Sequence, residues 1–245
     1  MLTDVNGVKI VRFRFGGLES SGYVCVIIQT NPHKMPQLLS QNSKLAKTSK
    51  AIGAKVMNFG IPAYRDINNK VTCPFANVND KSSPCYSCYA RKGAYIWPAA
   101  RNAYQWRYEQ TKLDSFVDDM VVAITKSKAK FIRVHDSGDY YSIDYINKWL
   151  AIANALPNVN FYSYTKSVKM WKDVISSGKL PSNYDIIFSQ GSVQDSLVDV
   201  AVDRHAKVFP TYEDMNIAGY VDAMGEDVQA TKWFNASNKV GLVFH

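Results

Sequence analysis

From residue 130 onward, short apolar segments alternate with longer amphipathic segments, and this alternation constrains the fold more than any other feature. The apolar segments predict β-strands, and the segments between them predict helices. Strands that alternate with helices form βαβ units, which build a parallel sheet. Because their crossovers share one hand, such units curl the sheet into a full or partial barrel. We predict strands at 131–135, 160–164, 185–189, 207–210 and 240–244, and helices at 143–156, 168–176 and 193–202.

The first 130 residues carry less regular signals. Segments 8–15 and 23–29 predict two strands of a β-hairpin, joined by a turn that contains two glycines. The other predicted elements are a basic arm or loop at 41–50, a buried strand at 56–61 that ends at Pro62, and helices at 99–113 and 114–126. We therefore expect an N-terminal hairpin or leader over residues 1–34 and a single α/β domain over residues 35–245.

Composition excludes several classes of protein. Hydrophobic residues make up 47% and charged residues 20% of the chain, which is typical of globular proteins and unlike disordered ones. The longest apolar run, at 24–28, is too short to span a membrane, and no signal peptide opens the chain. Four cysteines are too few for a disulfide scaffold. We therefore expect a cytoplasmic protein that has no membrane partner.

The positive charge lies in one half of the sequence. Residues 1–130 hold 19 Lys and Arg against 8 Asp and Glu, whereas residues 131–245 hold 10 against 13. A basic half predicts an anionic partner, such as nucleic acid or a nucleotide. The alternative, a basic surface that serves only solubility, stays open because no run of Lys and Arg is dense.

Polar residues follow three of the predicted strands at the points where these strands end. Because the carboxyl ends of parallel strands meet at one edge of a sheet, we expect these residues to form a ligand site. The candidates are Asp136, Ser137, Gly138, Asp139, Lys166, Ser189 and Gln190. Taken singly, some polar residues near strand ends cap helices, and Ser142 and Ser167 stand where N-caps belong.

Three cysteines, Cys73, Cys85 and Cys88, lie in a polar loop after the predicted strand 56–61. Thiolates bind zinc and iron, and a Cys-x-x-Cys pair allows two sulfur atoms to reach one metal centre. Structural zinc requires four ligands, and Cys25 or His135 is the available fourth. Cys25 stands in an apolar strand, where a core position is expected. The other interpretation is a three-thiolate iron–sulfur cluster that has one open iron.

Three segments resemble a known family. Residues 72–93 (TCPFANVNDKSSPCYSCYARKG), 133–139 (RVHDSGD) and 161–166 (FYSYTK) resemble the phage gene product 88 family, and Cys-x-x-Cys-Tyr-Ala is similar to phage three-cysteine proteins. The resemblance covers roughly residues 35–210. These proteins are in turn similar to radical S-adenosylmethionine enzymes, which implies a radical-SAM-like partial barrel in the host cytoplasm.

The resemblance also implies a cofactor and roles for the candidate residues. Cys73, Cys85 and Cys88 would hold a [4Fe–4S] cluster, and its open iron would bind S-adenosylmethionine. The residues that would contact this cofactor or line the rim are Asp136, Ser137, Gly138, Asp139, Lys166, Ser189 and Gln190. The expected function is redox or radical chemistry on a nucleotide or nucleic acid. One alternative is a non-catalytic iron–sulfur or zinc protein that binds nucleic acid or a host protein. Another is a hydrolase in which His135, Asp136 and Asp139 hold a divalent metal.

Overall fold

The computed structural model describes residues 3–5, 8–14, 23–29 and 36–244 and divides into two compact units, Met1–Pro36 and Gln37–His245. The first unit contains three antiparallel strands, β1 (Thr3–Val5), β2 (Val8–Arg14) and β3 (Tyr23–Gln29). Strands β2 and β3 confirm the predicted hairpin. The turn with the two glycines and the side chain of Cys25 lie outside the described residues.

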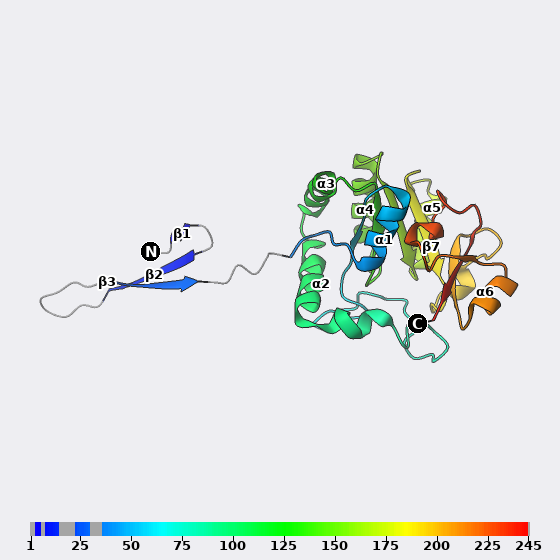
Figure 1. Ribbon diagram of the computed structural model, residues 1–245, viewed down its shortest axis with the longest axis horizontal. Coiled ribbons are helices and arrows are strands. Elements are labelled where there is room, and N and C mark those ends of the chain that lie inside the picture. Colours follow the sequence, from blue (N-terminus) through cyan, green and yellow to red (C-terminus); the bar gives the residue numbers. More distant parts are fainter. Residues whose placement is uncertain (1–2, 6–7, 15–22, 30–35, 245) are drawn as a thin grey trace, which may run out of the picture. The chain divides into compact units, whose positions relative to one another are not determined.

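The second unit is built on a seven-stranded parallel sheet, which curls into a half-barrel (Figure 1). Along the sheet the strands follow the order β4-β5-β6-β7-β8-β10-β9. Their bounds are β4 Val56–Phe59, β5 Phe131–Val134, β6 Asn160–Thr165, β7 Tyr184–Ser189, β8 His205–Phe209, β9 Val221–Asp222 and β10 Lys239–Val243. This confirms the predicted α/β class and the partial barrel. The strand β9 carries no strand signal in the sequence because it has only two residues.

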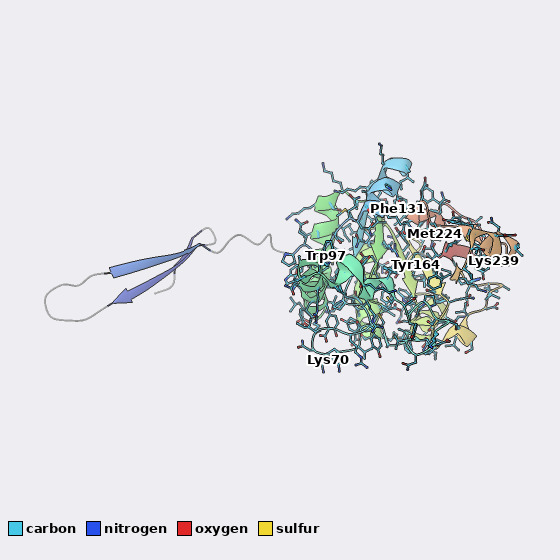
Figure 2. The ribbon with its side chains drawn as sticks, turned by 60° about the horizontal axis from the view of Figure 1, so that its bottom comes forward. Lys70, Trp97, Phe131, Tyr164, Met224 and Lys239 are labelled. Carbon is cyan, nitrogen blue, oxygen red and sulfur yellow. The ribbon has the colours of Figure 1, made fainter. Side chains whose placement is uncertain are left out.

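Four helices cover one face of the sheet and enclose the main hydrophobic core with it. They are α2 (Pro98–Gln110), α3 (Phe116–Ser127), α4 (Ile143–Ala155) and α5 (Val168–Ser176), all close to their predicted bounds. Side chains fill the space between helices and sheet (Figure 2). None of the described helices is long and apolar enough to cross a membrane.

Helix α4 shows why this layer forms where the pattern predicts it. Ser142 caps the helix by accepting a hydrogen bond from the Tyr145 backbone N–H. The apolar residues recur at helical spacing and bury one side of the helix against the sheet. Trp149, at the centre of this side, packs edge-to-face on Phe59 and Phe161 with ring centroids 5.2 and 6.5 Å apart.

The prediction of a loop at 41–50 is wrong, because α1 (Ser43–Ile52) occupies this segment. Asn42 caps the helix by accepting from the Leu45 backbone N–H at 2.9 Å, and Gly53 ends it at φ 64°. Only Leu45 and Thr48 are buried, so the apolar stripe is narrow. A helix that buries so few residues has nearly the same polar residue pattern as a basic loop.

The predicted helix at 193–202 is also wrong. Only one 3₁₀ turn, η3 (Asp195–Leu197), forms there. The Asp195 carboxylate accepts from the backbone N–H groups of Gly191 and Ser192 at 2.7 and 2.8 Å, which favours a loop over a helix. Helix α6 (Tyr212–Ile217) and the 3₁₀ turn η4 (Asp227–Ala230) are among the short elements that the sequence did not predict.

A buried charge cluster fastens α1 and η4 to the other, concave face of the sheet. Asp227 pairs with Arg133 of β5 at 2.8 Å and with Lys44 of α1 at 3.0 Å, and it accepts from the Tyr162 hydroxyl at 2.7 Å. Although burial opposes it, the two cations hold the pKa of Asp227 below its usual value. These groups pair with one another, and among the buried polar atoms of this cluster only Arg133 Nε has no hydrogen-bond partner among the described residues, so we assign the cluster a structural role.

Candidate metal centre

The cysteine-bearing loop follows β4 and is fastened over the carboxyl edge of the sheet, where the carboxyl ends of the strands meet. The Ser83 hydroxyl donates to the Gly191 carbonyl beyond β7 at 2.6 Å. The Tyr89 hydroxyl donates to the Asp136 carbonyl beyond β5 at 2.6 Å. An isolated antiparallel bridge joins Ala76 to Ser192. Contacts to two strand ends thus fix a loop that has little regular structure of its own.

Local contacts place each thiol. The Tyr64 backbone N–H donates to Cys73 Sγ at 3.2 Å, and Tyr64 has a positive φ of 65°. The Cys85 backbone N–H donates to the Ser83 hydroxyl at 3.2 Å. Cys88 directly precedes the 3₁₀ turn η1 (Tyr89–Arg91). All three cysteines are partly buried and free of disulfide bonds.

The three cysteines line one cavity of about 130 Å³, which we call the cysteine cavity. This volume exceeds that of a single water site several-fold, so the cavity can hold a group of several atoms. Five of the seven candidate residues from the strand ends line the same cavity: Ser137, Gly138, Asp139, Lys166 and Ser189. The juxtaposition follows from the parallel sheet, which brings the ends of β5, β6 and β7 to one edge.

The other two candidates, Asp136 and Gln190, do not line the cysteine cavity. Asp136 is buried below the loop, and its Oδ2 accepts from the Tyr104 hydroxyl at 3.0 Å. Its Oδ1 has no hydrogen-bond partner among the described residues, and burial raises the pKa of this carboxyl. Gln190 takes part through its backbone, whose carbonyl accepts from Lys166 Nζ at 2.8 Å.

Asp139 joins two strand ends and does not cap α4. Its Oδ1 accepts from the Thr165 hydroxyl at 2.6 Å and the Tyr140 backbone N–H at 2.7 Å, and its Oδ2 accepts from the Lys166 backbone N–H at 2.8 Å. Burial raises the pKa of Asp139, and these hydrogen bonds oppose the rise. The carboxylate therefore fixes the wall of the cavity.

Gly138 occupies a position that only glycine fits well. Its φ is 80°, and a Cβ there would collide with Ile61, whose carbonyl and side chain lie against it. We expected this glycine to let the backbone approach a ligand. The close approach in the structure is to the chain just after β4, and it draws the cysteine-bearing loop onto the end of β5.

Lys166 is a positive charge of the cysteine cavity that hydrogen bonds hold in place. Its ammonium group donates to the Ser189 carbonyl at 3.0 Å, the Ser189 hydroxyl at 2.8 Å and the Gln190 carbonyl at 2.8 Å. These acceptors carry no net charge, and no carboxylate of the described residues forms an ion pair with Lys166. Burial raises the pKa of Cys73 and of Cys85, and for Cys85 the Lys166 charge opposes that rise.

His135 is not available to complete a site with the three cysteines. Its backbone has a φ of 70°, and its imidazole points into the helix-covered core. There Nε2 lies 2.9 Å from the Tyr145 hydroxyl, and the ring packs against Tyr140. Burial lowers the pKa of His135 from 6.5 to about 3, which keeps the ring neutral. The hypothesis of a hydrolase built on His135, Asp136 and Asp139 loses its central residue.

Among the described residues, no three His, Cys, Asp or Glu side chains converge as they would on a single metal ion. Two thiolates on one tetrahedral zinc lie about 3.8 Å apart, because each Zn–S bond is about 2.3 Å long. The three thiols therefore share a cavity without sharing one coordination point.

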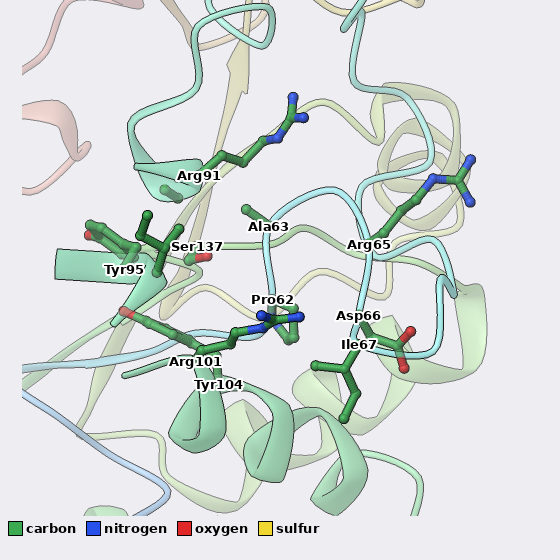
Figure 3. Close-up of a pocket in the computed structure, with 12 residues that line it drawn as sticks. Pro62, Ala63, Arg65, Asp66, Ile67, Arg91, Tyr95, Arg101, Tyr104 and Ser137 are labelled. Atoms are coloured by element: carbon green, nitrogen blue, oxygen red, sulfur yellow. The ribbon is translucent and has the colours of Figure 1, made fainter. Parts of the chain in front are cut away.

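A second cavity of about 250 Å³ adjoins the first, and we call it the arginine cavity (Figure 3). Its polar lining includes Arg65, Arg91, Arg101, Tyr95 and Tyr104. Our interpretation of the sequence missed these residues. The available signal was the segment 81–108, which holds five Lys and Arg, seven aromatic residues and no Asp or Glu.

Comparison with known proteins finds one family. The family model described as Gene product 88 matches residues 37–242. No match was found among curated proteins or among solved structures.

Proposed function

Because this chain belongs to the phage gene product 88 family and gathers three cysteines in one cavity, we propose that Cys73, Cys85 and Cys88 hold a metal centre. We propose further that this centre is a [4Fe–4S] cluster on a radical-SAM-like half-barrel. The observation that carries the proposal is the common cavity of the three thiols at the carboxyl edge of a parallel sheet. Parallel α/β sheets bind their ligands at this edge.

The positions of the thiols favour a cluster over zinc. A zinc ion requires ligands that converge on one point, and the described side chains do not converge in this way. In a cluster each thiolate binds a different iron, so the sulfur atoms stand further apart. His135, one of the two fourth zinc ligands that the sequence suggests, is engaged with Tyr145.

The residues around the thiols suit an anionic centre with an open side. Lys166 offsets negative charge, and no carboxylate of the described residues forms an ion pair with it, which lowers the cost of holding thiolates in a partly buried cavity. Asp139 and Ser137 line the remaining wall. When bound, such a cluster supplies one-electron chemistry, and with S-adenosylmethionine it supplies radical chemistry. We propose a nucleotide or nucleic acid as the substrate.

Metal analysis of anaerobically purified protein tests the centre. We expect iron and acid-labile sulfide in the wild type, and almost no iron in Cys85→Ser or Cys88→Ser, because two remaining thiolates hold a cluster poorly. The matched control is Cys25→Ser, which should keep the wild-type iron content. Stoichiometric zinc without iron would instead support a non-catalytic zinc protein and overturn the cluster.

Cofactor chemistry has its own test. Addition of S-adenosylmethionine to the reduced protein should perturb the EPR spectrum of the cluster and release 5′-deoxyadenosine. If iron and sulfide are present but the spectrum does not change, the protein is an iron–sulfur protein without the radical reaction.

A further inference from the structure

The arginine cavity lies where three segments meet, namely the chain after β4, the 3₁₀ turns that follow Cys88, and the first turns of α2. It shares Ala63, Ala90, Arg91 and Ser137 with the cysteine cavity. The two cavities are therefore neighbours with a common wall. A ligand held in one can present a group to the other.

The lining of the arginine cavity carries more positive than negative charge, with Arg65, Arg91 and Arg101 against Asp66. Among the described residues, no carboxylate forms an ion pair with Arg65, Arg91 or Arg101. Asp66 also lines the cavity, but its Oδ1 accepts from the backbone N–H groups of Asn68 and Lys70 at 2.9 and 2.7 Å. These hydrogen bonds hold the carboxylate against the backbone of the turn that follows Asp66.

Two of the three guanidinium groups contact the same aromatic side chain. Arg65 lies 5.0 Å and Arg91 5.3 Å from the centre of the Tyr64 ring, so both cations face one aromatic side chain. Figure 3 shows both side chains extending in the same direction. Both arginines are exposed, and neither has a carboxylate ion-pair partner among the described residues, so an anion from solvent can reach their guanidinium groups.

Aromatic side chains lie beside these charges. The rings of Tyr95 and Tyr104 line the cavity and stack with centroids 5.7 Å apart. Trp97 and Tyr86 come from the same acid-free segment and are 65% and 48% exposed. Exposed aromatic rings that alternate with Arg and Lys are typical of surfaces on which nucleic-acid bases stack.

We propose that the arginine cavity binds the phosphate group of a nucleotide, with the base stacked on the aromatic side chains at its rim. Guanidinium groups suit phosphate because their N–H groups match its oxygen atoms in pairs. A phosphate also carries enough negative charge to offset two or three arginines. The nucleotide is either free or the unit at one position of a single strand. Its binding does not depend on a metal, whereas its role as the substrate of the cluster rests on the proposed function.

The test measures binding of three probes at low salt: inorganic phosphate, a nucleoside 5′-monophosphate, and a labelled single-stranded oligonucleotide. For the probes that bind to wild type, Arg101→Ala should raise the dissociation constant about tenfold or more, because it removes a charge-assisted contact. The matched control is Lys126→Ala, which removes one positive charge from exposed α3. This control should change the dissociation constant less than twofold.

The probes distinguish the two sources of the nucleotide. Saturable binding of the monophosphate indicates a free nucleotide, whereas binding of the oligonucleotide alone indicates a single strand. For the oligonucleotide, the slope of log Kd against the logarithm of the salt concentration should be smaller by about one in Arg101→Ala, because one phosphate contact is lost. Absence of binding by all three probes would overturn the proposal, and so would equal weakening in Arg101→Ala and Lys126→Ala.

Binding to Cys85→Ser separates this proposal from the proposed function. We expect this variant to lose iron and to retain nucleotide binding within about threefold. Loss of both in Cys85→Ser, with circular dichroism unchanged, would mean that the nucleotide binds to the metal centre and not to the arginine cavity.

Discussion

The helix-covered face of the sheet and its carboxyl edge bury different kinds of side chain. The helix-covered core is dominated by large apolar and aromatic side chains around Trp149 and Trp171, many of them packed edge-to-face. Among the described residues, this core contains none of the buried aspartates. They all lie at the carboxyl edge, in the loops above it or on the concave face: Asp66, Asp136, Asp139, Asp185 and Asp227.

The difference shows how this fold separates stability from function. Apolar burial stabilises the helix-covered face without requiring any particular partner. A buried carboxylate is tolerated only where hydrogen-bond donors or cations surround it, which costs geometric freedom. Asp66, Asp136 and Asp139 lie at the cysteine and arginine cavities, whereas Asp185 and Asp227 pair with arginine or lysine side chains elsewhere. We therefore expect substitutions of large core side chains to lower the free energy of unfolding more than substitutions at the edge do.

The largest expected effect is the difference in free energy of unfolding between two single tryptophan substitutions. Trp149→Ala should lower the free energy of unfolding by about 3–5 kcal/mol, because it leaves a cavity in the aromatic core. Trp97→Ala, at the exposed edge, should change it by less than about 0.5 kcal/mol. Urea denaturation measures both. If Trp149→Ala yields no folded protein, Trp149→Phe should show a smaller loss in the same direction. Equal losses at the two tryptophans would contradict the separation.

Asp139→Asn tests the edge itself. The substitution replaces one acceptor oxygen by an N–H₂ group. This group then faces a donor, either the backbone N–H of Lys166 or the hydroxyl of Thr165. We expect the free energy of unfolding to fall by about 1–3 kcal/mol, with iron content maintained. Asp114→Asn, at an exposed carboxylate with no hydrogen bond to the described residues, is the control and should be nearly silent. If Asp139→Asn is as stable as the control, the carboxylate does not hold the cavity wall.

The pH dependence of stability tests the burial of His135, whose ring lies in the helix-covered core. The pKa of His135 falls from 6.5 to about 3 on folding, so between these values the unfolded chain binds a proton that the folded protein does not. The free energy of unfolding should therefore decrease as pH falls below about 6.5, by up to about 1.4 kcal/mol per pH unit. His135→Asn tolerates the positive φ and cannot titrate. Its stability should depend less steeply on pH than that of wild type, and identical slopes would refute this account.

The βαβ rhythm predicted most of the fold because it depends on local periodicity. Strand and helix positions from β5 to α5 follow from residues that alternate or recur every three to four positions. Helix α1 and the loop at 193–202 were predicted wrongly because side chains decide them, namely the Asn42 cap and the Asp195 carboxylate. A single hydrogen bond at a segment's end leaves little trace in periodicity.

The candidate site, too, could be predicted in part from the sequence. Because the carboxyl ends of parallel strands share one edge, the order of strands alone indicated that Asp139, Lys166 and Ser189 would lie together near the cysteines. The direction of each side chain could not be predicted in this way. The left-handed backbone at His135 turns its imidazole into the core, and Asp136 is buried beneath Tyr89 and Tyr104.

The amino-acid sequence by itself determined the α/β class, the positions of most strands and helices, and the meeting of three cysteines with three strand ends. These properties depend on hydrophobic periodicity and on the topology of parallel sheets. Only the tertiary structure decided that His135 leaves the site and that Arg65, Arg91 and Arg101 form a second cavity beside it. Arg65 lies outside the basic, aromatic segment 81–108 that holds Arg91 and Arg101, and the contacts that bring this segment to the chain after β4 act across the fold, beyond the reach of a local sequence pattern.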